Sequence, residues 1–77
     1  MKFINAGYEN SIDSEKIVAI TNPNSNPAKR AIKNANEMKL LIDITAGNKT
    51  GSIIIMESGH VILSAVKPET VKRRCGE

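Results

Sequence analysis

The chain has 77 residues and a formal net charge of +3, and its length fits one domain spanning residues 1–77. Its single cysteine, Cys75, rules out an internal disulfide, and one cysteine with one histidine is too few for a four-ligand structural zinc site. With no tryptophan, one tyrosine and one phenylalanine, the chain has few large side chains for a core. We therefore expect it to complete its core by associating with copies of itself.

The first third of the chain predicts two strands. Residues 2–6 are typical of a short edge strand, and residues 7–10 of a turn. Residues 12–15 fit no single element. Residues 16–21 are rich in β-branched side chains, which favours a second strand.

A helix is predicted after the Asn-, Ser- and Pro-rich loop at residues 21–27. Asn26 is a suitable N-cap and Pro27 a suitable first helical residue. The apolar side chains that follow have helical spacing and are mostly alanine, which allows close packing on a sheet. Ile32 is expected to be the main anchor. The stripe consists of Ala28, Ala31, Ile32, Ala35 and Met38.

Three more strands are predicted at residues 40–45, 52–56 and 60–66, with a loop at 46–51 and a hairpin turn at 58–59. A short helix or tail follows Lys67. The predicted order is β-β-α-β-β-β, an α+β fold. It has one small antiparallel sheet of about five strands, with the last three as consecutive antiparallel neighbours and the main helix on one face.

The sequence holds no arrangement typical of an enzyme. His60 lies near Glu57, but Cys75 is far along the chain and nothing predicts that they converge, so a solvated turn histidine is the favoured interpretation. Asp43 is interpreted as an outward-facing or networked carboxylate. We expect no catalysis, metal, cofactor or small-molecule substrate.

No stretch resembles an export signal, and no uninterrupted apolar run is longer than Ile53–Met56, which is far too short to cross a bilayer. We expect a cytoplasmic protein without a membrane partner.

Basic residues are scattered along the chain. The 46–51 loop lacks the residue order of a P-loop, but Asn48 and Lys49 are side chains that can contact phosphate. Lys29 and Arg30 lie on the polar helix face, where a solvated face is the simpler interpretation. Without an aromatic platform for single strands, the composition fits duplex DNA bound through its backbone.

Four segments resemble the RemA family of small bacterial regulators of extracellular matrix genes. They are KFINAGYEN at 2–10, NPNSNPAKRAI at 22–32, LIDITAGNKT at 41–50 and SIIIMESGHVILSAVKPETV at 52–71. The resemblance spans nearly the full chain. It implies a DNA-binding transcriptional regulator without enzymatic activity, a closed ring of copies that is octameric in the family, and promoter DNA that is bent or wrapped.

The resemblance also implies contact residues. The family's arginine before the second strand corresponds to Lys16, and its basic pair after the proline corresponds to Lys29 and Arg30. The family's loop sequence Arg-Arg-Thr-Arg is replaced here by residues 48–51, NKTG. Lysine keeps the charge without the bidentate fork. The sequence thus leaves two functions open, a DNA-binding regulator or a ring-forming interaction module that has lost strong DNA binding.

Overall fold

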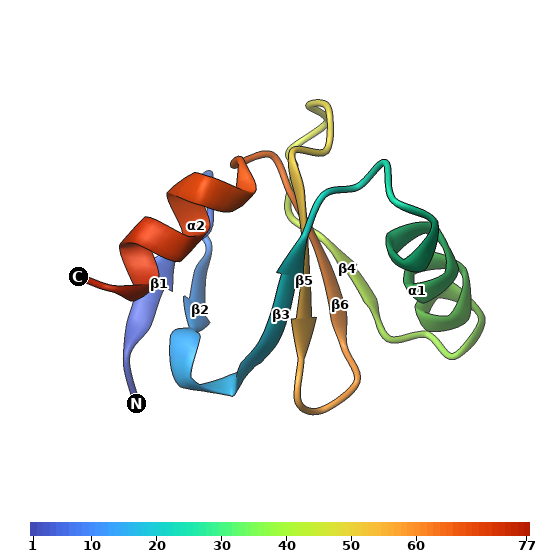
Figure 1. Cartoon of the computed structure of the whole chain (residues 1–77), viewed down its shortest axis with the longest axis horizontal. Helices are drawn as coiled ribbons and strands as arrows, with labels where there is room; N and C mark the ends of the chain where they lie inside the picture. The colour runs from blue at the N-terminus through green and yellow to red at the C-terminus, as the bar shows by residue number, and fades with distance from the viewer.

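The computed structural model describes all 77 residues. It has one main sheet with other elements packed on both of its faces (Figure 1). Four strands form this sheet in the order β3-β5-β6-β4, and two form a separate antiparallel ribbon, β1-β2. Two α-helices and one 3₁₀ turn complete an α+β fold. The elements are β1 (Phe3–Asn5), β2 (Ser11–Asp13), η1 (Ser14–Lys16), β3 (Ile17–Thr21), α1 (Asn26–Glu37), β4 (Leu41–Asp43), β5 (Ser52–Met56), β6 (Val61–Ser64) and α2 (Pro68–Cys75).

The sheet differs from the predicted one in its strand order. β3 pairs with β5 and β5 with β6, both antiparallel, but β4 pairs with β6 in parallel, with Leu41 opposite Val61. The prediction of three consecutive antiparallel strands after the helix was therefore wrong. The reason is the eight-residue connection at 44–51, which exceeds the usual hairpin loop and lets β5 run beyond β6 rather than beside β4.

The N-terminal segment also differs. Residues 12–15, which fitted no single element, contribute to β2 and η1, so β1 pairs with β2 and not with the main sheet. Ile4 and Ile12 lie opposite each other in this ribbon and are both buried. Their shared burial fixes the register of the ribbon, because a slip by one residue would point an isoleucine side chain away from the core and into solvent.

Each face of the main sheet has its own cover. Helix α1 lies over one face, where Ala28 and Ala35 contact Ile53 and Val61. The ribbon and α2 lie over the other face, where Ile54 and Ile62 pack with Val71 of α2. The alternating isoleucines of β5 therefore serve two different clusters.

Helix α1 begins one residue earlier than predicted. Ser25, not Asn26, is the N-cap, and its Oγ accepts a hydrogen bond from the Ala28 amide at 3.2 Å. At the other end Met38 is 70% exposed and does not belong to the buried stripe. Ile32 is half-buried against the sheet, so it shares its anchoring role with Ala28 and Ala35, which are almost fully buried.

Neither α1 nor α2 has the length and hydrophobicity of a membrane-spanning helix.

Candidate nucleic-acid interface

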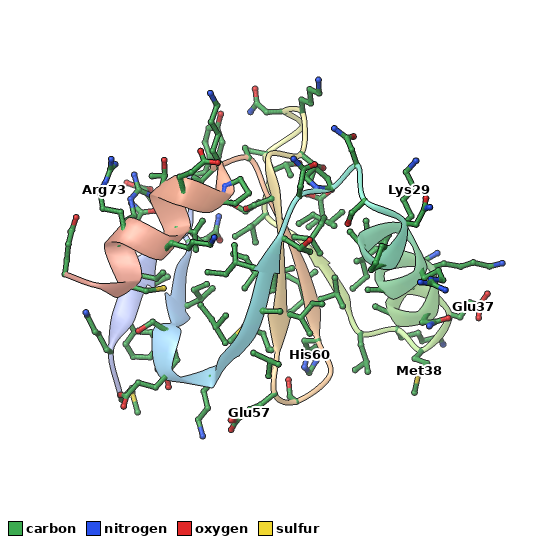
Figure 2. All side chains as sticks on the ribbon, viewed as in Figure 1. Lys29, Glu37, Met38, Glu57, His60 and Arg73 are labelled. Carbon is green, nitrogen blue, oxygen red and sulfur yellow. The ribbon has the colours of Figure 1, made fainter.

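One end of the molecule carries several predicted contact residues. The 46–51 loop projects beyond the sheet at this end, and Lys29 lies in the first turn of α1 on the same side (Figures 1 and 2). Lys29, Arg30, Asn48 and Lys49 are all exposed. We use the name loop end for the part of this region that consists of residues 22–25, 46–51 and 65–69. Lys29 and Arg30 on α1 are outside this definition.

A polar hollow of about 510 Å³ opens at the loop end. Lys49 and Lys67 line it together with Glu69, so its charged side chains are two cations and one anion. Neither lysine forms an ion pair, because the two ion pairs of the structure are Met1–Glu15 and Lys16–Glu57. The lining also includes the loop before α1 and Pro68, the first residue of α2. The positive end of the α2 dipole thus adds to the lysine charge.

Lys67 is a lysine of this hollow that the sequence did not predict as a contact residue. It stands outside any basic run, at the predicted start of a helix or tail. Only the fold brings it beside Lys49, since the amide of Gly51 donates a hydrogen bond to the Ser64 carbonyl at 2.7 Å and so holds the loop against the end of β6. The one signal in the sequence was a lysine placed directly before a helix-starting proline.

Asn48 has a structural role in the loop. Its Nδ2 donates to the Thr45 carbonyl at 3.1 Å and to the Ala46 carbonyl at 3.4 Å. These bonds support the left-handed backbone at Ala46 and Gly47, with φ of 54° and 82°. The amide donors are therefore largely occupied within the loop, while the neighbouring Lys49 side chain is exposed.

Asp43, the last residue of β4, directly precedes the connection that contains this loop. Its Oδ1 accepts hydrogen bonds from the Thr45 amide at 2.9 Å and the Thr45 hydroxyl at 2.7 Å. These two bonds lower the pKa of Asp43 below its usual value. The carboxylate is thus a local cap of the 44–48 turn, as a networked carboxylate would be.

Lys16 lies apart from the other predicted contact residues. It ends η1 and its Nζ contacts Glu57 Oε1 at 3.1 Å, at the far end of β5 from the 46–51 loop. The five residues of β5 place this pair roughly 16 Å from the loop end. The hydrogen bond to Glu57 and the charge of Glu57 raise the pKa of Lys16. Within one chain the structure therefore does not bring Lys16 and Lys49 together.

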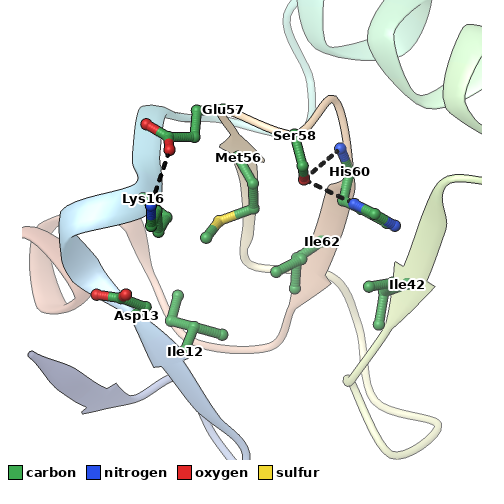
Figure 3. Close-up of a pocket in the computed structure, with 9 residues that line it drawn as sticks. All are labelled: Ile12, Asp13, Lys16, Ile42, Met56, Glu57, Ser58, His60 and Ile62. Carbon is green, nitrogen blue, oxygen red and sulfur yellow. Dashed lines mark hydrogen bonds and ion pairs between the residues drawn. The ribbon is translucent and has the colours of Figure 1, made fainter. Parts of the chain in front are cut away.

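The Lys16–Glu57 pair borders an apolar hollow of about 590 Å³ (Figure 3). Ile12, Ile42, Met56 and Ile62 form its floor, and Ile42 is 42% exposed. β4, which carries Ile42, is an outer strand of the sheet, so one of its hydrogen-bonding edges is free. The hollow is therefore an uncovered part of the core beside an open sheet edge.

His60 lies on the rim of this hollow. Its Nδ1 is 2.7 Å from the Ser58 hydroxyl, a contact between residues two apart in the same turn (Figure 3). A serine nucleophile needs its histidine to be oriented by a third group, and the nearby Glu57 carboxylate is engaged by Lys16. The Ser58–His60 contact is therefore a local hydrogen bond within the hairpin turn. No group of three or more His, Cys, Asp or Glu side chains lies close enough to hold a metal ion.

These features define a small α+β protein with an open basic end and an uncovered apolar face. The chain belongs to the RemA-like family, described as extracellular matrix regulatory protein A-like, which matches residues 3–75.

Close relatives carry regulatory names. A protein of Geobacillus kaustophilus named "Putative regulatory protein" is 51% identical over 74 residues, covering 96% of this chain and 85% of its own length. Proteins with the same name from Bacillus cytotoxicus and Bacillus cereus are 45% identical with the same coverage. A regulatory role is therefore shared by the family and these relatives.

Proposed function

We propose that this protein is a cytoplasmic, DNA-binding transcriptional regulator that acts as a homo-oligomeric ring and controls extracellular matrix genes of the kind for which its family is named. The observation that carries the proposal is the pair of unpaired cations, Lys49 and Lys67, that share one hollow at the loop end. Phosphate contacts in DNA complexes come from such lysines, from backbone amides and from helix N-termini. Lys29 lies in the first turn of α1 at the same end of the molecule (Figure 2), and Arg30 follows it as a second exposed cation.

Binding at the loop end would be mainly electrostatic. Few of its side chains suit base readout in the major groove. Each subunit would neutralise only a few phosphates, and several subunits in one assembly would add their weak contacts by avidity. Specificity would then depend on DNA shape and on the spacing of the subunits.

Lys16 enters this proposal through a neighbouring subunit. Because Lys16 lies at the opposite end of β5 from Lys49, head-to-tail contact between copies is needed to bring the two lysines near one DNA strand. Its partner Glu57 provides a sharp test, since Glu57→Gln frees the ammonium group. If Lys16 contacts phosphate, Glu57→Gln tightens DNA binding and Lys16→Ala weakens it. Unchanged affinity in both variants removes Lys16 from the interface.

The main experiment measures binding of a labelled duplex by fluorescence anisotropy between 50 and 200 mM salt. The log–log slope of affinity against salt is about −0.9 per neutralised phosphate. Lys49→Ala and Lys67→Ala should each weaken binding to all sequences alike and flatten this slope. Lys39→Asn is the matched control, because it removes one exposed lysine beyond the C-terminal end of α1 and asparagine tolerates the φ of 61° found there.

A second function is a ring-forming interaction module without strong DNA binding. The Lys16–Glu57 ion pair favours it, because that lysine is already neutralised within the chain. Wild-type protein that assembles but shows no salt-dependent duplex binding supports the module and contradicts the regulator that acts through DNA.

A further inference from the structure

The turn between β1 and β2 has an unusual backbone for its sequence. Gly7, Tyr8 and Glu9 are all left-handed, with φ of 108°, 51° and 64°. Two-residue hairpin turns of this kind are normally made from asparagine and glycine, because other side chains are disfavoured at positive φ. Tyr8 and Glu9 are therefore strained choices at their positions.

Hydrogen bonds hold this turn in place. The Gly7 amide donates to Asn5 Oδ1 at 2.7 Å, and Asn10 Nδ2 donates to the carbonyls of Gly7 at 3.0 Å and Tyr8 at 3.2 Å. The Ala6 amide donates to the Asn10 carbonyl at 2.8 Å. The strain is thus maintained by a defined network. Strain of this kind is concentrated at functional sites.

The Tyr8 side chain forms no hydrogen bond that accounts for this conformation. It is 56% exposed, so its hydroxyl is open to a partner outside the chain. An aromatic ring held outward by a rigid turn is a feature of contact surfaces, because the ring offers a large area and loses little conformational freedom on binding.

The turn adjoins the loop end. A Cβ placed on Gly7 would lie 3.0 Å from Val66 Cγ2, and Val66 is followed directly by Lys67 of the lysine hollow. Figure 1 shows the β1–β2 turn at the same end of the molecule as the connection from β6 to α2. The turn that carries the exposed Tyr8 therefore lies at the end of the molecule where the basic hollow opens.

We propose that Tyr8 contacts duplex DNA bound at the loop end, with its ring packed against the deoxyribose and its hydroxyl donating to a backbone phosphate. Tyrosine hydroxyls are among the groups that contact the sugar–phosphate backbone. This inference rests on the proposed function, because it names a further contact to the same DNA. It also gives a reason for an aromatic side chain at a strained turn position.

The key variant is Tyr8→Asn, which removes the ring and suits the left-handed backbone. Its melting temperature should equal or exceed that of the wild type, while its affinity for a labelled duplex should fall about tenfold, roughly the contribution of one good contact. Tyr8→Phe, which keeps the ring, should lose about two- to threefold. Loss of function without loss of stability separates a contact residue from a structural one.

Glu9→Asn is the matched control. It relieves the same backbone strain at the next position and removes a carboxylate that would repel phosphate, so duplex binding should stay equal or become tighter. Tyr8→Asn that binds within twofold of the wild type overturns the inference, provided that Lys49→Ala weakens binding in the same assay. If the wild type shows no duplex binding at all, the proposed function and this inference fail together.

A spectroscopic measurement tests the contact directly. Tyr8 is the only tyrosine in the chain, so incorporation of 3-fluorotyrosine gives one ¹⁹F resonance. Addition of duplex at low salt should shift or broaden this resonance, and high salt should restore it. A resonance that stays unchanged while anisotropy shows saturated binding contradicts the contact.

Discussion

Two serines that face each other across β5 and β6 have opposite hydrogen-bonding states. Ser52 and Ser64 are paired in register and both are fully buried. The Ser64 hydroxyl donates to the Ala6 carbonyl at 2.7 Å and accepts from the Val66 amide at 3.1 Å, whereas the Ser52 hydroxyl has no partner. An unpaired buried hydroxyl costs about 1–3 kcal/mol.

We therefore expect Ser52→Ala to raise the free energy of unfolding, or to leave it unchanged, and Ser64→Ala to lower it by about 1–3 kcal/mol. Urea denaturation at fixed protein concentration measures both. Equal destabilisation by the two substitutions would show that a water or a partner subunit satisfies Ser52.

Asp43 should make stability depend on pH in the acid range. Because its pKa is lowered in the folded state, its contribution to stability is present above the unfolded pKa of about 3.9 and is lost as pH falls through the folded pKa. Asp43→Asn should thus melt at a lower temperature than the wild type near pH 6, and the gap should narrow as pH falls below 4. A gap that is constant with pH would contradict this role.

Gly51 limits how far the family's loop charge can be restored. Its φ is not in the left-handed region, but a Cβ there would lie 2.6 Å from the Ala65 carbonyl oxygen. Gly51→Arg should therefore destabilise the protein in a thermal melt, because backbone rather than a flexible side chain occupies the space. Tolerance of Gly51→Arg would show that the loop moves away from β6.

Asn48→Arg should fold, losing two loop hydrogen bonds, and should bind duplex DNA more tightly than the wild type.

At the scale of elements, α1 depends on small side chains for its close approach to the sheet. Ala28 and Ala35 are almost fully buried, and Ile32 adds half-buried area beside them. Ile32→Ala should lower the free energy of unfolding by about 1–3 kcal/mol, near the low end of the range for isoleucine because the site is only half-buried. Met38→Ala, at the exposed C-cap, should change it by less than about 0.5 kcal/mol. Equal effects in urea denaturation would mean that the buried face of α1 is different from the one described.

At the scale of the whole molecule, the core is small. Only 13 of the 77 residues are buried, and the hollow around Ile42 leaves apolar surface open beside the free edge of β4. We propose that a second copy covers this hollow, because a strand from another subunit can add at that edge while its side chains fill the hollow. The rim charges of Lys16 and Glu57 already neutralise each other.

Light scattering at micromolar concentration should show an assembly for the wild type and smaller species for Ile42→Glu, which places a charge in the covered hollow. Met38→Glu is the control, since Met38 is exposed and does not line the hollow. An assembly that persists in Ile42→Glu, or a wild type that is a stable monomer, would contradict this interface.

The sequence by itself predicted most elements correctly because their signals are local. The β-branched runs gave β3, β5 and β6, and the prolines with their polar neighbours gave the start of α1 to within one residue. The α+β class and the RemA-like family followed from the same local patterns. The β2 strand was missed because three residues, of which only Ile12 is buried, carry too little periodicity to predict an element.

Tertiary structure alone decided which segments are neighbours. The parallel pairing of β4 with β6 depends on where a long connection leads the chain, and no local preference specifies that path. The same pairings place Lys67 beside Lys49, set Lys16 at the opposite end of β5 with Glu57, and bring the Tyr8 turn against Val66. The basic residues of the site could be read from the sequence. Their grouping at one end of the molecule arises from long-range contacts. These contacts form only when α1 buries one face of the sheet and the ribbon with α2 buries the other.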